Sequence, residues 1–379
     1  MNTEQDFDYT DDDTDDDTEY ENYNLSNFLS NAVKARPEYE LRAMLSLHKS
    51  DSLKKLARTY KMKGYASSKK SDMIEFLCRT LDDSGFIEHI LLHTNDEEYD
   101  FFESIAVSGK LDMTASEAIN KPYHIFRTLY FMDFYSISGK ITFVIPDVIR
   151  NIYLDLCKTP FPSTRKTYSM IDTFATAFTT LYGMVDFDYF IDICNSQLQV
   201  NMDYVELANI LFEFTWLRDA SYTVFGSLLI HSLIDEHTVE TEVDENVIET
   251  SNAEVDRLET VRDEIPIKDL PVEEILKYSD KGYYEHTPAH DQLIPFLKAH
   301  DPELMQIPAV QQHILGNLRR DLSQNDDIKV DLLGFEFRKY ESDIEAMKTY
   351  NDLIRDVERH TRKWSKNGWT LAEIEAENI

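Results

Sequence analysis

The sequence predicts a mainly α-helical protein of several small helical domains, one of which carries a β-hairpin. Three observations support this fold class. The chain has 379 residues, a length that suits two or three domains better than one. Apolar residues recur at helical spacing over most of the chain. Tracts of very different charge separate the apolar stretches, so domains and linkers are expected to alternate.

The bulk composition limits the function. The formal net charge is -33, from 71 acidic and 38 basic residues. Such a charge excludes a protein that coats nucleic acid or anionic membrane with its whole surface, although one basic module remains compatible with it. The three cysteines are far apart, which argues against a disulfide framework and for a reducing, cytoplasmic location. No stretch approaches the roughly 20 apolar residues of a membrane span, so no membrane partner is expected.

The chain begins with a strongly acidic tract. Residues 1–24 hold eleven acids and no base, a composition that does not collapse into a core. The sequence therefore predicts a disordered acidic tail. Its role is either to increase solubility or to mimic nucleic acid and cover a basic surface, on this chain or on a partner.

Residues 34–95 form the basic module of the prediction. Between Lys34 and Arg79 there are twelve Lys or Arg and five Asp or Glu, an excess of seven positive charges. The spacing predicts a helix that begins near Ser50 or Asp51, either of which can cap it. Gly64 is expected to take a positive φ after this helix, and a second helix is expected over residues 69–81.

One run in this module resembles a known family. The run L-K-K-L-A-R-T-Y-K-M-K-G-Y-A-S-S-K-K-S-D-M-I-E-F-L is similar to the SAP and Rho N-terminal type of small helical module. The resemblance implies binding of DNA or RNA, or docking to a protein. It makes Lys61, Lys63, Lys69 and Lys70 the candidate phosphate contacts, with backbone N–H groups at residues 68–71 beside them. The alternative is a small helical domain with solvated lysines.

Residues 96–160 are expected to form an α+β domain. Helices are predicted over 100–107 and 115–131, then a hairpin around Gly139, then a helix over 147–156 that starts after Pro146. Helices followed by a hairpin resemble a winged helix. Because few Lys and Arg residues occur here, a scaffold role is as compatible with the sequence as recognition of DNA.

The next two segments differ sharply in composition. Residues 161–235 predict a helical domain in which the segment 221–233 is either a strand pair or another helix. Residues 236–275 predict an acidic linker, because the tract from Asp235 onward holds fifteen acids and three bases.

Residues 276–379 predict a C-terminal helical domain, with helices over 293–300, 310–322 and 343–364. The runs Y-S-D-K-G-Y-Y-E-H-T-P and H-T-R-K-W-S-K-N-G-W-T resemble uncharacterised bacterial proteins that combine a Rho-type N-terminal module with a C-terminal SEC-C metal knuckle. The knuckle needs clustered Cys and His, and no cysteine follows Cys194. The resemblance therefore does not imply zinc binding here.

Two further groups are candidate sites. His286 and His290 are four residues apart and are metal candidates, although Pro288 between them disfavours one regular helix. The alternative is a turn or a capped helix start. Arg362, Trp364 and Trp369 are candidates for stacking on a base or a peptide. Their alternative role is to fix a helix end to its domain.

No catalytic motif accompanies these groups. The glycines are too widely spaced for a dinucleotide-binding loop, a P-loop or a nucleophile elbow, and no zinc-hydrolase or C-x-x-C motif occurs. We therefore expect no cofactor and no enzyme activity; an enzyme whose acids and histidines converge only in three dimensions is the minority alternative. The sequence predicts a nucleic-acid-associated accessory or regulatory protein. The alternative is a protein–protein interaction adaptor that binds no nucleic acid.

Overall fold

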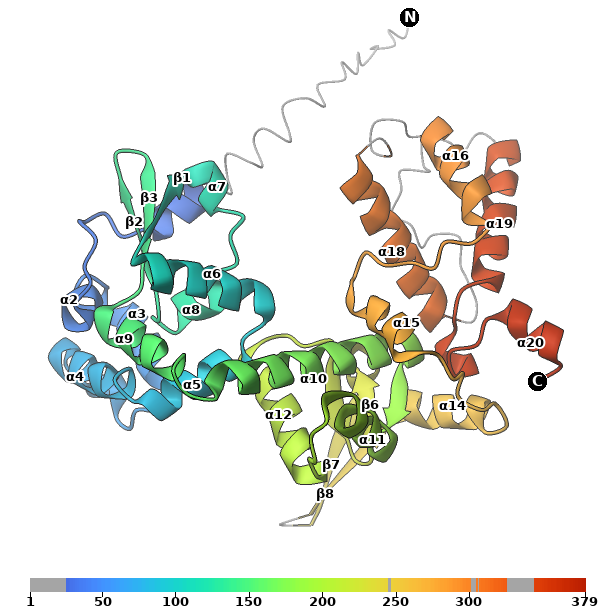
Figure 1. The fold of residues 1–379 in the computed structure, drawn as a ribbon, viewed down its shortest axis with the longest axis horizontal. Coiled ribbons are helices and arrows are strands. Elements are labelled where there is room, and N and C mark those ends of the chain that lie inside the picture. Colours follow the sequence, from blue (N-terminus) through green and yellow to red (C-terminus); the bar gives the residue numbers. More distant parts are fainter. Residues whose placement is uncertain (1–24, 245–246, 301–304, 306, 326–343) are drawn as a thin grey trace, which may run out of the picture. The chain divides into compact units, whose positions relative to one another are not determined.

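The computed structural model describes residues 25–244, 247–300, 305, 307–325 and 344–379 (Figure 1). The predicted acidic tail, residues 1–24, lies outside this part. The chain divides into two compact units, one up to Lys166 and the other from Thr167. The predicted fold class is confirmed: the described residues are mainly helical and contain only small sheets. Within them, no helix combines the length and apolar character that crossing a membrane requires.

The first unit joins helices to a small antiparallel sheet. Its elements are α2 (Leu41–Ser46), α3 (Ser50–Thr59), η1 (Tyr65–Ser67), α4 (Lys70–Thr80), α5 (Ser84–His93), α6 (Asp96–Ser108), β1 (Leu111–Thr114), α7 (Ala115–Ala118), α8 (His124–Thr128), β2 (Asp133–Ile137), β3 (Lys140–Val144) and α9 (Asp147–Leu156). The strand order is β1-β3-β2, and β2 and β3 form the predicted hairpin. The single helix predicted over 115–131 is wrong, because α7 and α8 are separate and Pro122 lies between them.

The boundary predicted between residues 34–95 and 96–160 is also wrong, because the two segments share one interior. Asp133, at the start of β2, has no exposed surface. Its carboxylate lies 2.5 Å from Nε2 of His48 and 2.9 Å from Nε of Arg127. A buried carboxylate needs such partners, and His48 comes from the basic segment. The two segments therefore form one unit.

The second unit is larger. Its elements are α10 (Phe161–Tyr182, which starts just before the division), β4 (Met184–Asp186), α11 (Phe187–Leu198), α12 (Tyr204–Leu217), β5 (Tyr222–Phe225), β6 (Leu228–His231), α13 (Ser232–Asp235), β7 (Thr238–Asp244), β8 (Val247–Asn252), α14 (Ala253–Arg262), α15 (Val272–Leu276), η2 (Lys277–Ser279), α16 (His290–His300), α18 (Pro308–Gln324), α19 (Ile344–Arg359), η5 (Trp364–Lys366) and α20 (Leu371–Glu377). Residues 221–233, left open by the sequence, contain the strand pair β5–β6. The expected helical domain thus also carries a sheet, ordered β4-β6-β5.

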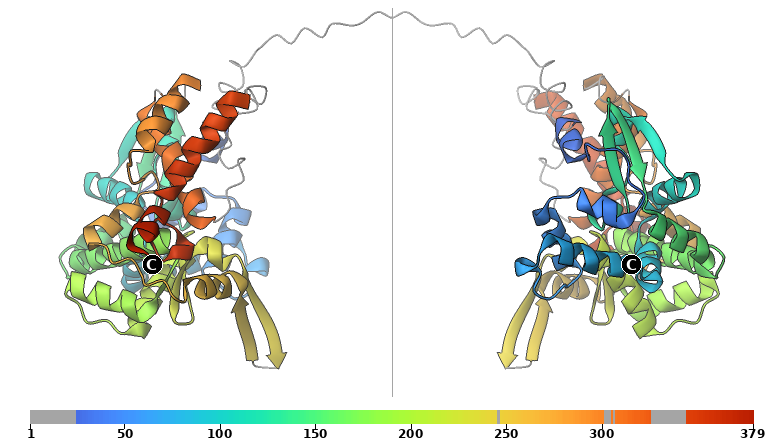
Figure 2. Two further views of the ribbon diagram at one scale, coloured as in Figure 1. Left: turned by 90° about the vertical axis from the view of Figure 1, so that its right-hand side faces the viewer. Right: turned by 90° about the vertical axis from the view of Figure 1, so that its left-hand side faces the viewer.

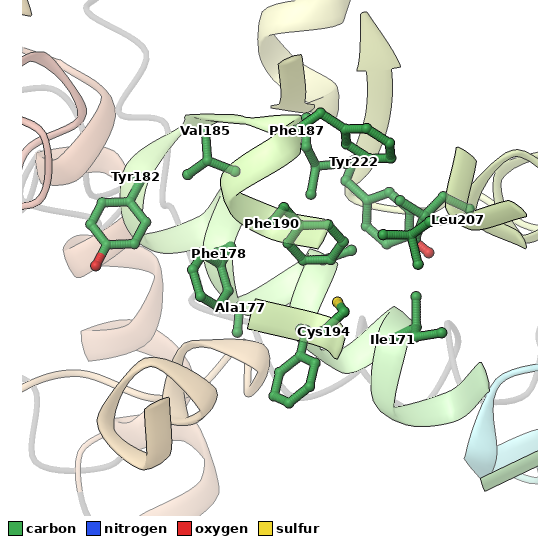
Figure 3. Close-up of a cluster of buried hydrophobic side chains, with 14 of the residues drawn as sticks. Ile171, Ala177, Phe178, Tyr182, Val185, Phe187, Phe190, Cys194, Leu207 and Tyr222 are labelled. Carbon is green, nitrogen blue, oxygen red and sulfur yellow. The ribbon is translucent and has the colours of Figure 1, made fainter. Parts of the chain in front are cut away.

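Aromatic side chains fill the core beneath this sheet (Figure 3). Phe178 of α10 meets Phe190 of α11 edge to face, with ring centroids 5.8 Å apart. Leu207 of α12 and Tyr222 of β5 are buried in the same cluster. Large apolar areas removed from water in this way are the main stabilising contribution to the unit.

The predicted linker, residues 236–275, is largely folded, so that prediction is wrong. Strands β7 and β8 form a hairpin that extends from the body of the second unit (Figure 2), and α14 follows it. Val255, Leu258 and Arg262 lie on one face of α14 and are buried. The acids of α14 occupy its other faces, which is why acidic composition concealed a helix with a buried stripe.

The C-terminal helices α16, α18 and α19 share a second core, to which Leu293, Leu315 and Ile354 contribute. These helices match the three that the sequence predicts there, but the last ends at Arg359 rather than near residue 364. The backbone N–H of His360 donates to Val357 O, which tightens the final turn and ends the helix.

Candidate nucleic-acid interface

The basic surface is built on α3, η1 and α4. Helix α3 ends at Thr59, and the next residue, Tyr60, donates its hydroxyl to the backbone oxygen of Leu129 at 2.6 Å. Burial raises the pKa of Tyr60. This half-buried tyrosine fixes the start of the loop on the rest of the first unit.

The loop then turns through two left-handed residues. Lys61 has φ 57° and Gly64 has φ 72°, so the predicted positive φ of Gly64 is confirmed. The left-handed Lys61 ends α3, because it lets the backbone N–H of Met62 donate to Ala57 O at 2.8 Å. The predicted cap of α3 is wrong: the N-cap is Lys49, and no side chain bonds the first turn.

Three of the four predicted phosphate-contact lysines have no counterion among the described residues. Lys61, Lys63 and Lys69 are exposed. Within the described part of the chain, none of them lies within 4.0 Å of a carboxylate oxygen. Lys70 is different, because its Nζ donates to the backbone oxygen of Ser46 at 2.8 Å. Lys70 thus also holds the C-terminal end of α2 to the start of α4.

An acidic residue nearby is already engaged elsewhere. Glu75 of α4 binds Arg42, with an N–O distance of 2.5 Å. The hydrogen bond from Arg42 lowers the pKa of Glu75. Because the Glu75 carboxylate is paired with Arg42, this carboxylate does not neutralise the lysines of the loop.

The helix start at residues 68–71 is a less suitable anion site than the sequence indicates. The N-cap of α4 is Lys69, and no side chain caps its backbone N–H groups. However, Asp72 lies in the first turn and accepts a hydrogen bond from Ser71 Oγ at 3.1 Å. This carboxylate repels a phosphate at that position, so the attraction comes from the lysine side chains.

Of the two roles open for Arg362, Trp364 and Trp369, the structure favours fixing a helix end over stacking on a base or a peptide. Both tryptophans are buried, and their indole N–H groups donate to the backbone oxygens of Thr180 and Pro266 respectively. Arg362 lies 2.9 Å from Glu285 and 3.0 Å from Glu373. With buried faces and a paired guanidinium, these side chains fix the chain after α19 to the second unit.

The metal candidates His286 and His290 lie near each other, with ring centroids 5.8 Å apart, at the start of a helix, as their alternative role expects. His286 is exposed and precedes α16, whereas His290 is the buried first residue of that helix. Its Nδ1 accepts from the backbone N–H of Thr287, and burial is the main cause that lowers the pKa of His290 to about 4. Over the residues described, no group of three or more His, Cys, Asp and Glu side chains is placed to hold a metal ion.

Sequence reasoning missed the buried charges. Arg262 is buried and donates to the backbone oxygens of Tyr182, Met184 and Trp364. The helical spacing from Val255 was a local signal for its burial. Asp133 offers no such signal, because His48 is 85 residues away along the chain.

Helix α12 presents an unusual apolar surface. Val205, Phe212 and Trp216 are 61%, 63% and 49% exposed, and their spacing puts them on one side of the helix. The opposite side of α12, which includes Leu207 and Leu211, packs into the core. Such an exposed apolar face usually binds a partner protein.

Comparison with known proteins gives no relative: no family model matches the chain, and no curated protein or solved structure matches it either. The resemblances to SAP, Rho N-terminal and SEC-C-associated proteins therefore remain predictions.

Proposed function

We propose that this protein is a non-enzymatic, nucleic-acid-associated accessory protein that contacts phosphates through Lys61, Lys63 and Lys69. The observation that carries the proposal is that these three ammonium groups are exposed and lack carboxylate partners among the described residues, although the chain has a net charge of -33. Arg42 of the same segment, by contrast, is paired with Glu75. The three unpaired lysines lie on one helix–loop–helix and form a local cationic surface.

The physical basis of binding is counterion release. Each phosphate that a lysine neutralises frees condensed cations from the nucleic acid. The logarithm of the binding constant then falls with the logarithm of salt concentration, by about 0.7 per phosphate for single strands and about 0.9 for duplexes. Such contacts carry little sequence information, so we expect weak sequence preference.

The test measures binding of the full chain to fluorescent single-stranded RNA, single-stranded DNA and duplex DNA by anisotropy over a series of salt concentrations. The triple variant K61E/K63E/K69E is expected to bind more than about tenfold more weakly and to lower the salt slope by about 2 to 3. The comparison of probes also decides between DNA and RNA.

A matched control separates local contacts from net charge. Lys121, Lys158 and Lys166 are also exposed lysines of the first unit. The variant K121E/K158E/K166E has the same change in net charge and is expected to keep most of the affinity. Equal loss in both variants, or no salt-dependent binding by the wild-type chain, contradicts the proposal.

The second candidate function is a protein–protein adaptor, and the exposed face of α12 favours it. In this case the face formed by Val205, Phe212 and Trp216 binds the apolar surface of a protein partner. A stoichiometric partner that survives nuclease treatment, and that is lost from F212S/W216S but retained by K61E/K63E/K69E, supports the adaptor. Loss of the partner from the lysine variant alone instead indicates that nucleic acid bridges the two proteins.

A further inference from the structure

A polar cleft of about 830 Å³ lies in the second unit, apart from the lysine surface. It is lined by residues of α10, the β5–β6 hairpin, η2 and α18. Hydroxyl groups line much of it, including those of Thr176, Thr180, Ser221 and Ser279. This volume lies in the range of about 300–1,000 Å³ typical of small-molecule sites, and the hydroxyl lining suits a ligand that itself carries hydroxyl groups.

One wall of the cleft holds a buried cation that has no counterion among the described residues. Arg319 of α18 is only 6% exposed. Its Nε donates to the backbone oxygen of Tyr283 at 3.1 Å, and its guanidinium lies 5.3 Å from the ring centroid of Tyr278. The Nη1 atom of Arg319 has no hydrogen-bond partner in the part of the chain that the structure describes. No carboxylate in that part forms an ion pair with Arg319. Burying a charge in this way is unfavourable unless an anion compensates it.

Other positive groups accompany Arg319. Arg320 is half-buried and donates to Asn317 Oδ1 at 3.0 Å, and Lys281 is exposed at the edge of the cleft. His231 also lines the cleft and is buried. Burial is the largest cause that lowers the pKa of His231 to about 4, and repulsion from Arg320 and Arg319 adds to it. The electrostatic potential at this end of the cleft is therefore positive.

Four carboxylates also line the cleft, but among the described residues none of them forms an ion pair with Arg319 or Arg320. Asp219 and Glu236 are exposed, so solvent screens them. Asp235 accepts a hydrogen bond from Thr238 at 3.0 Å. Burial raises the pKa of Asp321, and the charge of Arg320 lowers it. These acids restrict an anionic ligand to the end of the cleft where the two arginines lie.

We infer that this cleft binds a small, hydroxyl-rich phosphate ester, with its phosphate beside Arg319 and Arg320. Guanidinium groups match the geometry of phosphate oxygens, and their hydrogen bonds to phosphate are charge-assisted. The phosphate would supply the missing counterion of Arg319, and the threonine and serine hydroxyls would bind the rest of the molecule. The inference does not rest on nucleic-acid binding, because none of the three lysines lines this cleft.

The test uses the full chain with glucose 6-phosphate, AMP, inorganic phosphate and unphosphorylated glucose. Calorimetry and the midpoint of thermal unfolding are measured with each compound. We expect saturable binding and a raised midpoint with at least one of the two esters, weaker binding of inorganic phosphate, and none of glucose. A preference between the esters shows whether a sugar or a nucleoside carries the phosphate.

The variants identify the phosphate position. Arg320→Gln removes a half-buried cation with little risk to the fold. The affinity of this variant for the phosphate ester is expected to fall roughly ten- to hundredfold. Arg319→Met keeps the apolar length of the side chain and is expected to lose binding; far-UV circular dichroism checks that it folds. Arg355→Gln is the matched control, because Arg355 is exposed on α19 and outside the cleft.

The outcomes separate this inference from the proposed function. Unchanged phosphate-ester binding by K61E/K63E/K69E, together with loss in Arg320→Gln, supports a site of its own in the second unit. Absence of binding to both esters at millimolar concentration overturns the inference. Full affinity in Arg320→Gln overturns it as well, and leaves Arg319 as a structural residue.

Discussion

The two units contain the same order of elements around their first sheets, yet these regions bury different chemistry. The first runs α6-β1-α7-α8-β2-β3, and the second runs α10-β4-α11-α12-β5-β6. Both sheets are antiparallel, and in both the last strand lies in the middle. In the first region the helices after the opening strand have 4 and 5 residues, whereas in the second they have 12 and 14.

The interior differs accordingly. Beneath its hairpin the first unit encloses the carboxylate of Asp133 between His48 and Arg127. The longer helices of the second unit enclose an aromatic core and leave the face around Phe212 and Trp216 exposed. The comparison teaches that strand order alone does not assign a function, because helix length and charge decide which surface is available.

All three tryptophans, Trp216, Trp364 and Trp369, belong to the second unit. Tryptophan fluorescence therefore reports on that unit alone, and circular dichroism reports on both. This difference lets the following predictions assign a loss of stability to one unit.

The largest expected effect concerns the ion cluster of the first unit. Asp133→Asn leaves the Arg127 guanidinium without its buried carboxylate, and the expected loss is about 3–5 kcal/mol of unfolding free energy. Asp155→Asn is the control, because its ion pair with Lys158 is exposed and is expected to contribute less than about 1 kcal/mol. Urea unfolding followed by circular dichroism measures both. Similar values for the two variants would contradict a stabilising role for the cluster.

The second prediction concerns pH and the second unit. The folded pKa of His231, about 4, lies below the 6.5 of an unfolded histidine, so the unfolded chain takes up the proton first as pH falls. Stability is therefore complete above pH 6.5 and declines towards pH 4, by about 3 kcal/mol for this group. His231→Gln should flatten the decline seen by tryptophan fluorescence. The exposed His286, replaced by Gln, serves as the control, and an unchanged slope in His231→Gln would reject the assignment.

The third prediction compares the glycines that end α6 and α10. Gly109 and Gly183 have φ values of 86° and 74°, so alanine at either position is expected to cost about 1–2 kcal/mol. A Cβ on Gly109 meets nothing within 4 Å, but one on Gly183 would lie 2.5 Å from Cδ2 of Trp364. Gly183→Ala should therefore lose about 1–3 kcal/mol more than Gly109→Ala. Equal losses in urea unfolding would show that the indole moves aside freely.

The smallest expected effect is on the exposed face of α12. Because Phe212 and Trp216 are largely exposed, F212S/W216S should change the unfolding free energy by no more than about 0.5 kcal/mol. Thermal unfolding by circular dichroism measures this change. A loss of several kcal/mol would mean that the face is covered within the protein and is not free for a partner.

The prediction from sequence was most accurate where structure is local. Helix α9 matches its predicted range 147–156, and α4 differs from the prediction 69–81 by one residue at each end. The positive φ of Gly64 was also predicted correctly. Helical spacing, a proline before a helix and a glycine in a turn act over a few residues, so a single segment reports them.

The candidate sites were predicted less well. The four lysines were identified from the charge excess and from a resemblance, but only the structure distinguishes Lys70, bound to Ser46, from the other three. The two tryptophans and His290 were candidates for binding because their residue types are common in binding sites. Their burial depends on backbone oxygens of other segments, such as that of Thr180, which is 184 residues from Trp364.

By itself the sequence determined the helical class, the acidic net charge with one basic island, and the positions of several helices, such as α4 and α9. The tertiary structure alone decided which charges are paired. It enclosed Asp133 with His48 and Arg127, bound Arg262 to three backbone oxygens, and left Nη1 of Arg319 without a hydrogen-bond partner among the described residues. The reason is physical: the energy of a charge depends on its burial and on neighbours within a few ångströms, and folding brings those neighbours from distant parts of the chain.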